Sequence, residues 1–223
     1  MKTINFCGDS FCKKERVSAA WTTLLADKLN ASIIGWGKGG FAHEYAIKTF
    51  DDTADYTIFC WTEAHRLHVN QTYSTNLWTL EAMFEPHKLG LSSAVKLRQP
   101  TPTNRDKAAY AYYKYLYDPV LHHERQIRDL YWFDNVVLPK YKGVAVHIFC
   151  FRNTYTFTNG INVSDILQQR TREYQLKKLN PDYTLQDNDF NNYANHLTEQ
   201  ENSGLADKIY NIIKEDHEKT NYK

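Results

Sequence analysis

The chain has 223 residues, a length at which one α/β domain can bury a core without covalent cross-links. Lys and Arg number 27 against 26 Asp and Glu, so a net charge of +1 supplies no general field to hold nucleic acid or an anionic membrane. We therefore expect a single domain over residues 1–223, with neither nucleic acid nor a membrane as a partner.

The N-terminus, MKTINFCGDS, contains a mostly apolar segment of four residues, INFC, which is too short for the core of a secretory signal. No apolar stretch approaches the roughly 20 residues of a membrane span. These features predict no signal peptide, and residence in a cytoplasm or in a particle assembled there. The four cysteines lack the paired spacing of a zinc site, so we expect free buried thiols and no metal: Cys7, Cys12, Cys60 and Cys150.

Strands and helices are expected to alternate along the first part of the chain. The predicted strands are residues 3–7, 31–34, 56–61 and 144–151, and the predicted helices between the first three strands are residues 17–29 and 41–50. Alternation of this kind is typical of a parallel sheet covered by helices. The sequence therefore predicts an α/β fold in three layers, α/β/α, around a mostly parallel sheet.

Residues 70–140 are polar and aromatic, and they are predicted to form a long insertion between the third and fourth core strands. Its opening part, residues 70–105, is expected to be loop-like and to form either a lid or a surface excursion. A long helical stretch near 106–133 is expected to cross back to the sheet. An amphipathic helix over 203–215 closes the chain.

The block Gly8-Asp9-Ser10 directly follows the first predicted strand. Ligands of parallel sheets bind at the carboxyl ends of the strands, because the connecting loops converge there. Gly8 permits a tight turn, and the backbone amide of Ser10 is placed to donate to a developing oxyanion. An ordinary polar turn is the simpler reading of the tripeptide alone, but its position makes Ser10 a candidate nucleophile.

A glycine-rich loop, residues 35–40 (GWGKGG), lies between the second predicted strand and the next helix. Its spacing fits neither a P-loop nor a dinucleotide-binding fingerprint. The amide of Gly40 would lie near the start of the helix, where an oxyanion is favoured. A plain structural turn is the alternative.

Two further groups complete the set of candidates. Thr62, Glu63 and Arg66 follow the third predicted strand, and His196 precedes the last helix. A serine nucleophile needs a base, and imidazole has a suitable pKa near neutrality. We take His196 as that base and interpret these other histidines as structural or exposed: His43, His87, His122, His123, His147 and His217.

These blocks, in this order, resemble those of the SGNH (GDSL-like) hydrolase superfamily. The residues of the last two blocks are similar to those of SGNH-like proteins of bacteriophages. These blocks are Trp61-Thr62-Glu63 with Arg66, and Asn195-His196-Leu197-Thr198. The resemblance implies a flavodoxin-like fold in which Ser10 is the nucleophile, the Gly40 amide helps to form the oxyanion hole and His196 is the base. It implies no cofactor.

The third block departs from the family pattern, because Glu63 stands where the family has Asn. A carboxylate facing an oxyanion opposes catalysis. Either Glu63 turns away, for instance toward Arg66, or Thr62 supplies a donor instead. A further alternative is that Glu63 and Arg66 bind substrate at the rim of the site.

The fourth block departs as well, because Tyr193 stands three residues before His196, where the family has Asp. The triad is therefore incomplete by sequence. Asp189, Asn192 or a backbone carbonyl is left to orient the imidazole, and the sequence does not choose among them.

The sequence thus predicts a serine esterase that forms an acyl intermediate on Ser10. The expected substrate is a small or glycan-borne acyl ester, with O-acetyl favoured, since tyrosines in residues 110–117 could stack on sugars. Helical spacing of Tyr110, Tyr113 and Tyr117 is better explained by core packing. The alternative function is a catalytically weak or inactive binding or structural protein on the same fold, such as a phage particle component.

Overall fold

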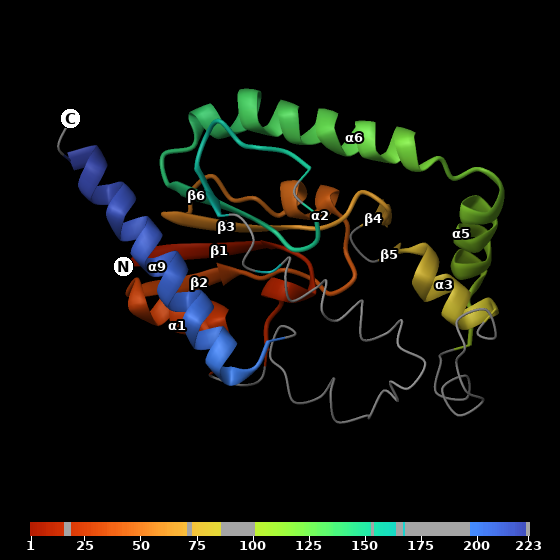
Figure 1. Cartoon of the computed structure of the whole chain (residues 1–223), viewed down its shortest axis with the longest axis horizontal. Coiled ribbons are helices and arrows are strands. Elements are labelled where there is room, and N and C mark those ends of the chain that lie inside the picture. Colours follow the sequence, from red (N-terminus) through yellow and green to blue (C-terminus); the bar gives the residue numbers. More distant parts are fainter. Residues whose placement is uncertain are drawn as a thin grey trace.

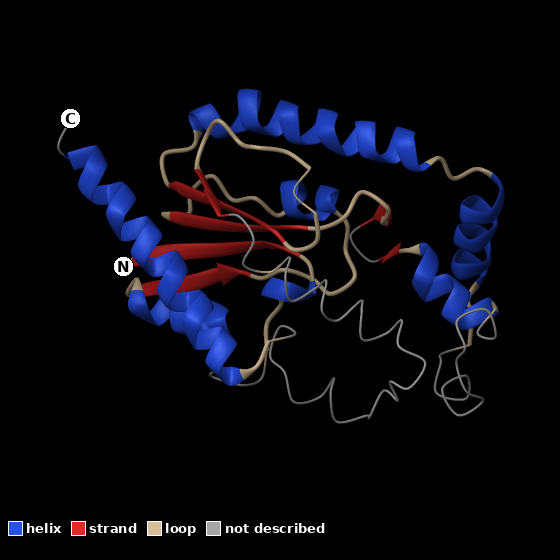
Figure 2. Ribbon diagram, viewed as in Figure 1, coloured by secondary structure: helices blue, strands red, loops and turns tan. Residues whose placement is uncertain are grey.

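A computed structural model of the chain describes residues 1–15, 19–70, 73–85, 101–152, 154–163, 167 and 197–221. Its centre is a five-stranded, all-parallel sheet (Figure 1, Figure 2). In spatial order the strands are β2 (Ala31–Gly35), β1 (Lys2–Gly8), β3 (Tyr56–Trp61), β6 (Val144–Phe149) and β7 (Ile161–Val163). The predicted α/β fold with a parallel central sheet is confirmed.

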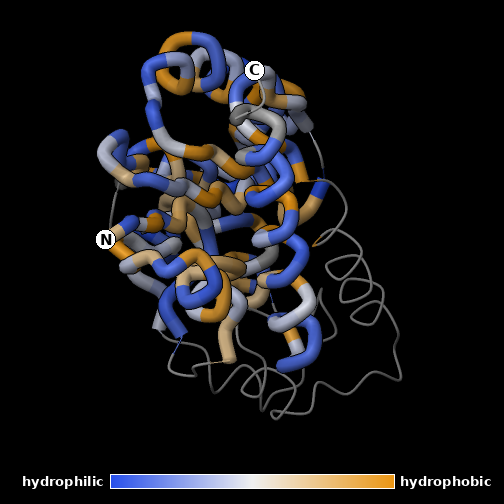
Figure 3. Tube along the Cα trace, turned by 90° about the vertical axis from the view of Figure 1, so that its left-hand side faces the viewer, coloured by the Kyte–Doolittle hydropathy of each residue, from blue (hydrophilic) through white to orange (hydrophobic). Residues whose placement is uncertain are grey.

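Helices cover both faces of this sheet, as Figure 1 shows. On one face lie α1 (Trp21–Lys28) and α9 (Glu199–Asn221), and on the other lie α2 (His43–Lys48) and α6 (Pro119–Trp132). Successive strand residues point to opposite faces, so Ile58 packs into the cluster with α1 and α9, and Phe59 into the cluster with α2 and α6. Along the helices in Figure 3, hydrophobic and hydrophilic residues alternate, as expected of helices with one buried face.

The direction in which strands are added to the sheet reverses between β1 and β3. From β1 the chain adds β2 on one side of the sheet, and then adds β3, β6 and β7 on the other. In open parallel sheets, ligands bind in the crevice at the carboxyl ends of the two strands where the order reverses. The loops that follow β1 and β3 carry Ser10 and Arg66, so the fold puts both candidates at this position.

The prediction of one long helical stretch near 106–133 is wrong, because the structure has two helices there. α5 (Asn104–Tyr115) ends before Asp118, and α6 begins at Pro119. The Asp118 carboxylate accepts hydrogen bonds from the amides of Val120 and Leu121, at 2.8 and 3.2 Å. An aspartate cap followed by proline in the first helical turn is a strong start signal for a new helix. α6 is extended by a π-helical turn, Phe133–Val137, and a 3-10 turn, Leu138–Lys140.

The insertion is also more ordered than the sequence indicates. Where a loop was expected, β4 (Leu67–Asn70) and β5 (Tyr73–Thr75) form an antiparallel pair followed by α3 (Leu77–Phe84). These elements share a small core with α5 that is separate from the main sheet and contains Leu80, Ala109 and Tyr113. Residues 86–100 lie outside the described residues, so the choice between a lid and a surface excursion stays a prediction.

Other element boundaries differ from the expected ones by a few residues. α1 begins at Trp21 rather than at 17, α2 is shorter than 41–50, and α9 extends well beyond 203–215 at both ends. The short edge strand β7 falls in a polar, Asn-rich stretch that gave no strand signal.

The four cysteines are free and buried, as predicted. Burial raises the pKa of the Cys7, Cys12 and Cys60 thiols, so these side chains are protonated near neutral pH. Among the described residues, no helix has both the length and the apolar character needed to cross a bilayer.

Candidate active site

Ser10 begins a single 3-10 turn, Ser10–Cys12, directly after β1. The turn starts here because the Asp9 carboxylate accepts a hydrogen bond from the Phe11 amide at 3.0 Å and so caps it. Gly8 has φ +157°, and a Cβ added there would lie 2.4 Å from the carbonyl oxygen of Cys60. Only glycine lets β1 approach β3 this closely before the chain turns. Ser10 itself is partly exposed, as a nucleophile must be.

The glycine-rich loop lies directly on this turn. The Gly37 amide donates to the Cys12 carbonyl at 3.0 Å, and the Lys38 amide donates to the Gly8 carbonyl at 2.9 Å. Gly37 has no room for a side chain, since an added Cβ would lie 2.5 Å from Cys12 Sγ. Two blocks that the sequence identified separately are therefore joined by backbone hydrogen bonds.

The far end of the loop reaches the serine side chain. A Cβ built on Gly39 would lie 3.7 Å from Ser10 Cβ, which is ordinary van der Waals contact. Gly40 follows with φ +80°, a left-handed conformation that favours glycine. The loop thus turns beside Ser10 and then leads into α2.

The third block lies at the same edge of the sheet. Arg66 forms an ion pair with Asp9, Nη2 to Oδ2 at 3.2 Å, and both side chains are buried. Glu63 is directed toward Arg66, with its Oε1 3.7 Å from Arg66 Nε. Of the arrangements considered for Glu63, the structure therefore has the one in which the carboxylate lies beside the guanidinium.

Thr62 is buried in this block and its side chain is unusual. Its carbonyl accepts a hydrogen bond from Gln126 Nε2 at 2.8 Å, which links β3 to α6. Its hydroxyl oxygen is buried and has no hydrogen-bond partner within the described part of the chain. A buried hydroxyl without a partner is costly, so a native structure that keeps one invites a functional explanation.

The structure does not describe the predicted base or the residues predicted to orient it. His196, Asp189, Asn192 and Tyr193 lie outside the described residues, so the pairing of Ser10 with His196 stays a prediction. The chain is described again at Leu197, the next residue, which is buried in the same core cluster as Phe11.

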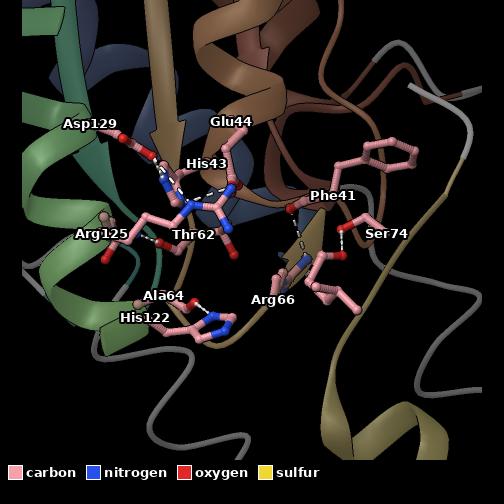
Figure 4. Close-up of polar contacts among 12 residues, drawn as sticks. Phe41, His43, Glu44, Thr62, Ala64, Arg66, Ser74, His122, Arg125 and Asp129 are labelled. Carbon is pink, nitrogen blue, oxygen red and sulfur yellow. Dashed lines mark hydrogen bonds and ion pairs between the residues drawn. The ribbon is translucent and has the colours of Figure 1, made fainter. Parts of the chain in front are cut away.

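Sequence reasoning missed a polar group around the buried His43 that connects α2 to α6, shown in Figure 4. His43 is 3% exposed; its Nε2 lies 3.1 Å from Asp129 Oδ2 and its Nδ1 lies 3.3 Å from Glu44 Oε2. Arg125 closes the ring, with Nη2 2.5 Å from Glu44 Oε1 and Nε 3.8 Å from Asp129 Oδ2. Although burial opposes ionisation, the hydrogen bond from His43 and nearby arginines lower the pKa of Asp129.

The same group is the set of side chains with metal-ligand spacing. One ligand atom each from His43, Glu44 and Asp129 lies within 4.8 Å of the others. The two carboxylates, however, flank opposite nitrogens of the imidazole, and the Arg125 guanidinium lies against both of them and offsets one of their two charges. The arrangement is that of a salt-bridged network holding two helices together rather than of a preformed metal centre.

Histidines and tyrosines elsewhere behave largely as the structural interpretation predicted. His147 is buried, with Nδ1 3.1 Å from Trp61 Nε1 and Nε2 3.0 Å from the Asn159 carbonyl oxygen. Tyr113 is buried, and its hydroxyl donates to the His65 carbonyl at 2.5 Å. Tyr110 stacks on Phe84 with ring centroids 4.8 Å apart. These contacts support core packing in the insertion over exposed sugar-stacking faces.

The chain was compared with models of known protein families, with curated proteins and with solved structures, and none of the three comparisons gives a match. The fold and the site therefore define the protein as an α/β protein with a parallel sheet and a serine-bearing turn at the point where the strand order reverses. The SGNH resemblance continues to rest on the residues of the chain alone.

Proposed function

We propose that the chain is a serine hydrolase of the SGNH type that cleaves acyl esters. The observation that carries the proposal is the docking of residues 35–40 on the Gly8–Cys12 turn, through the Gly37 and Lys38 amides, which brings Gly39 beside a partly exposed serine and Gly40 directly after it. Donors fixed in advance around a nucleophile are what stabilises a tetrahedral oxyanion. A purely structural turn needs no second glycine loop beside its serine.

In the proposed reaction, Ser10 Oγ attacks the ester carbonyl carbon while His196 accepts the hydroxyl proton. The negative charge that develops on the carbonyl oxygen is stabilised by the amides of Ser10 and Gly40. Collapse of the tetrahedral intermediate expels the alcohol, to which His196 returns the proton. Water, deprotonated by His196, then attacks the acyl-serine, and the second tetrahedral intermediate releases the acid as His196 returns the proton to Ser10 Oγ. Asp189 is the candidate to orient the imidazole, with Asn192 or a backbone carbonyl as alternatives.

The proposed substrate is a small acyl ester, with an O-acetyl group on a glycan as the first choice to test. Arg66 is only 7% exposed and contacts Asp9 and Glu63, so little of it is left for substrate. Glu63 is more accessible, with 28% of its side chain exposed. If the third block contacts substrate, we therefore expect Glu63 to make that contact.

A second candidate function is a binding or structural protein of the same fold with weak or no activity. The observation in its favour is the third block, where a carboxylate occupies the position at which the resembled family has an amide donor. Such a protein would retain the Ser10 turn but lack a reactive hydroxyl.

Labelling with a fluorophosphonate separates these two functions. We expect stoichiometric labelling that peptide mass spectrometry locates at Ser10, together with hydrolysis of p-nitrophenyl acetate, and we expect Ser10→Ala and His196→Ala to abolish both. Ser32→Ala, an exposed serine on β2, and His123→Ala, an exposed histidine on α6, are the matched controls. Absent labelling, or labelling that survives Ser10→Ala, would exclude the proposed nucleophile and favour the binding protein.

A further inference from the structure

Arg66 lies at the carboxyl edge of the sheet and contacts the segments that follow four different strands. Its Nη2 pairs with Asp9 Oδ2 at 3.2 Å, after β1, and its Nη1 donates to the Phe41 carbonyl at 3.3 Å, after β2. Its Nε lies 3.7 Å from Glu63 Oε1, after β3, and its guanidinium carbon lies 5.3 Å from the ring centroid of Phe151, after β6. One side chain thus joins the segments that make up the carboxyl edge of the sheet.

Two of these contacts act on the parts of the site that chemistry requires. Asp9 caps the turn that presents Ser10, so the guanidinium holds that cap in place. Phe41 directly follows Gly40, so the hydrogen bond to its carbonyl fixes the end of the glycine loop. Figure 4 shows Arg66 directed at the Phe41 carbonyl. Besides the two backbone hydrogen bonds between the loop and the turn, one guanidinium therefore contacts both the cap of the serine turn and the end of the glycine loop.

The chemistry of the contacts favours arginine over lysine here. Asp9 is fully buried, and a buried carboxylate is strongly unfavourable without a countercharge and hydrogen bonds. Asp9 Oδ2 has the guanidinium as its countercharge but has no hydrogen-bond partner among the described residues. A rigid, planar guanidinium can face this carboxylate with one nitrogen while another donates to the Phe41 carbonyl, whereas an ammonium on a flexible stem cannot keep both contacts in the same geometry. Its flat face also suits the contact with Phe151.

We infer that Arg66 is a positioning residue that sets the spacing between Ser10 and the Gly40 amide by holding the Asp9 carboxylate and the Phe41 carbonyl together. This inference rests on the proposed hydrolase function. It assigns no proton transfer and no substrate contact to Arg66. It predicts that the charge alone is insufficient and that the fork geometry is required.

The main test is Arg66→Lys, which keeps the positive charge that Asp9 needs. We expect the rate constant for fluorophosphonate labelling of Ser10 and the kcat for p-nitrophenyl acetate to fall by about 100-fold, the loss that a misplacement near 1 Å produces. KM should change by less than about twofold, because the substrate contacts are unaltered. Arg125→Lys, which alters an arginine ion-paired to Glu44 instead, should leave both rates unchanged.

A second readout does not depend on catalysis. Cys12 lies in the Ser10 turn and Cys7 lies in β1, and both thiols are fully buried. In Arg66→Lys we expect the maleimide modification of Cys12, followed by peptide mass spectrometry, to accelerate at least about threefold relative to Cys7, because the turn opens locally more often. Arg125→Lys should leave this ratio as in the wild type.

The outcomes are separable. Wild-type labelling kinetics in folded Arg66→Lys would overturn the inference while leaving the hydrolase proposal intact, and so would a loss explained wholly by the fraction of unfolded protein. If the wild-type chain is not labelled at all, the hydrolase proposal fails. In that case an unchanged ratio of Cys12 to Cys7 modification overturns the positioning role, and an increased ratio supports it.

A double-variant experiment checks whether Arg66 acts through Asp9. It compares Arg66→Met with the same substitution made together with Asp9→Asn. Asparagine can still cap the Phe11 amide but carries no charge. We expect the double variant Asp9→Asn/Arg66→Met to be labelled no more slowly than Arg66→Met alone, as holds for residues that act as a unit. Losses that multiply would show that the two residues act independently and would contradict the inference.

Discussion

Asn202 on α9 caps the neighbouring helix α1, 181 residues earlier in the chain. Its side-chain oxygen accepts a hydrogen bond from the Trp21 amide at 2.8 Å, and its side-chain nitrogen donates to the carbonyls of Leu197 and Thr198, each at 3.0 Å. α1 has no side-chain cap of its own, because Ala20 occupies that position. One buried amide therefore joins two helices on the same face of the sheet and fixes the backbone that follows His196.

Replacing Asn202 by Ala is expected to destabilise the fold by about 1–3 kcal/mol, because the change leaves the Trp21 amide and a carbonyl buried without partners. Urea unfolding followed by circular dichroism measures this loss. Asn211→Ala, at an exposed position of the same helix, should change the free energy of unfolding by less than about 0.5 kcal/mol. Equal effects of the two substitutions would show that the Asn202 cap on α1 contributes no more to stability than helix propensity does.

Substitutions of Thr62 test whether its buried hydroxyl takes part in catalysis. Thr62→Val keeps the shape and removes a buried hydroxyl that has no hydrogen-bond partner among the described residues, so the free energy of unfolding should stay equal or increase. If Thr62 donates to the oxyanion in place of the family's Asn, kcat for p-nitrophenyl acetate should fall by about 100-fold. Thr62→Ser should retain activity. A fully active Thr62→Val would remove Thr62 from the proposed oxyanion hole.

His147 is expected to make stability depend on pH. Burial lowers the pKa of His147 to about 3, well below its ordinary value of 6.5. Between these values the unfolded chain binds a proton that the folded chain does not, so stability is complete above about pH 6.5 and is lost as the pH falls toward 3. The expected contribution to the slope approaches about 1.4 kcal/mol per pH unit in the middle of this range.

The measurement is the free energy of unfolding in urea between pH 4 and 7. His147→Gln should reduce this slope by the contribution of one proton, about 1.4 kcal/mol per pH unit. This reduction is expected whatever the substitution does to the stability at pH 7. His123→Gln, on the exposed side of α6, controls for replacing a histidine outside the core. Parallel curves for the wild type and His147→Gln would mean that His147 is protonated in the folded state, contrary to the contacts with Trp61 and Asn159.

Local patterns predicted those parts of the molecule that depend on neighbouring residues. β3 was found at its observed boundaries because Tyr56–Trp61 is a β-favouring run that is apolar except for Thr57 and lies between polar residues, as expected of a strand buried on both faces. Ser10 and the glycine loop were placed at the sheet edge because each directly follows a strand. The break at Asp118 was also visible in the sequence, as an aspartate followed by proline, but the helical spacing on either side concealed it.

Contacts between distant residues were not predictable in this way. His43 and Asp129 are 86 residues apart, and nothing in the local sequence of either residue indicates the other. The Arg66 contact with Asp9 is similar, because a charged residue after a strand is usually solvated and only the fold buries this one. β7 was missed because its three residues take their strand conformation from pairing with β6.

The small core of α3, α5 and the β4–β5 pair has a consequence for how this protein can diverge. It is attached to the sheet between β3 and β6, which pair with each other directly whatever lies between them. The entropy cost of closing a flexible loop rises only with the logarithm of its length, by about 0.6 kcal/mol for each doubling. Changes in the length of this unit are therefore expected to cost the sheet little, because the pairing of β3 with β6 does not pass through it.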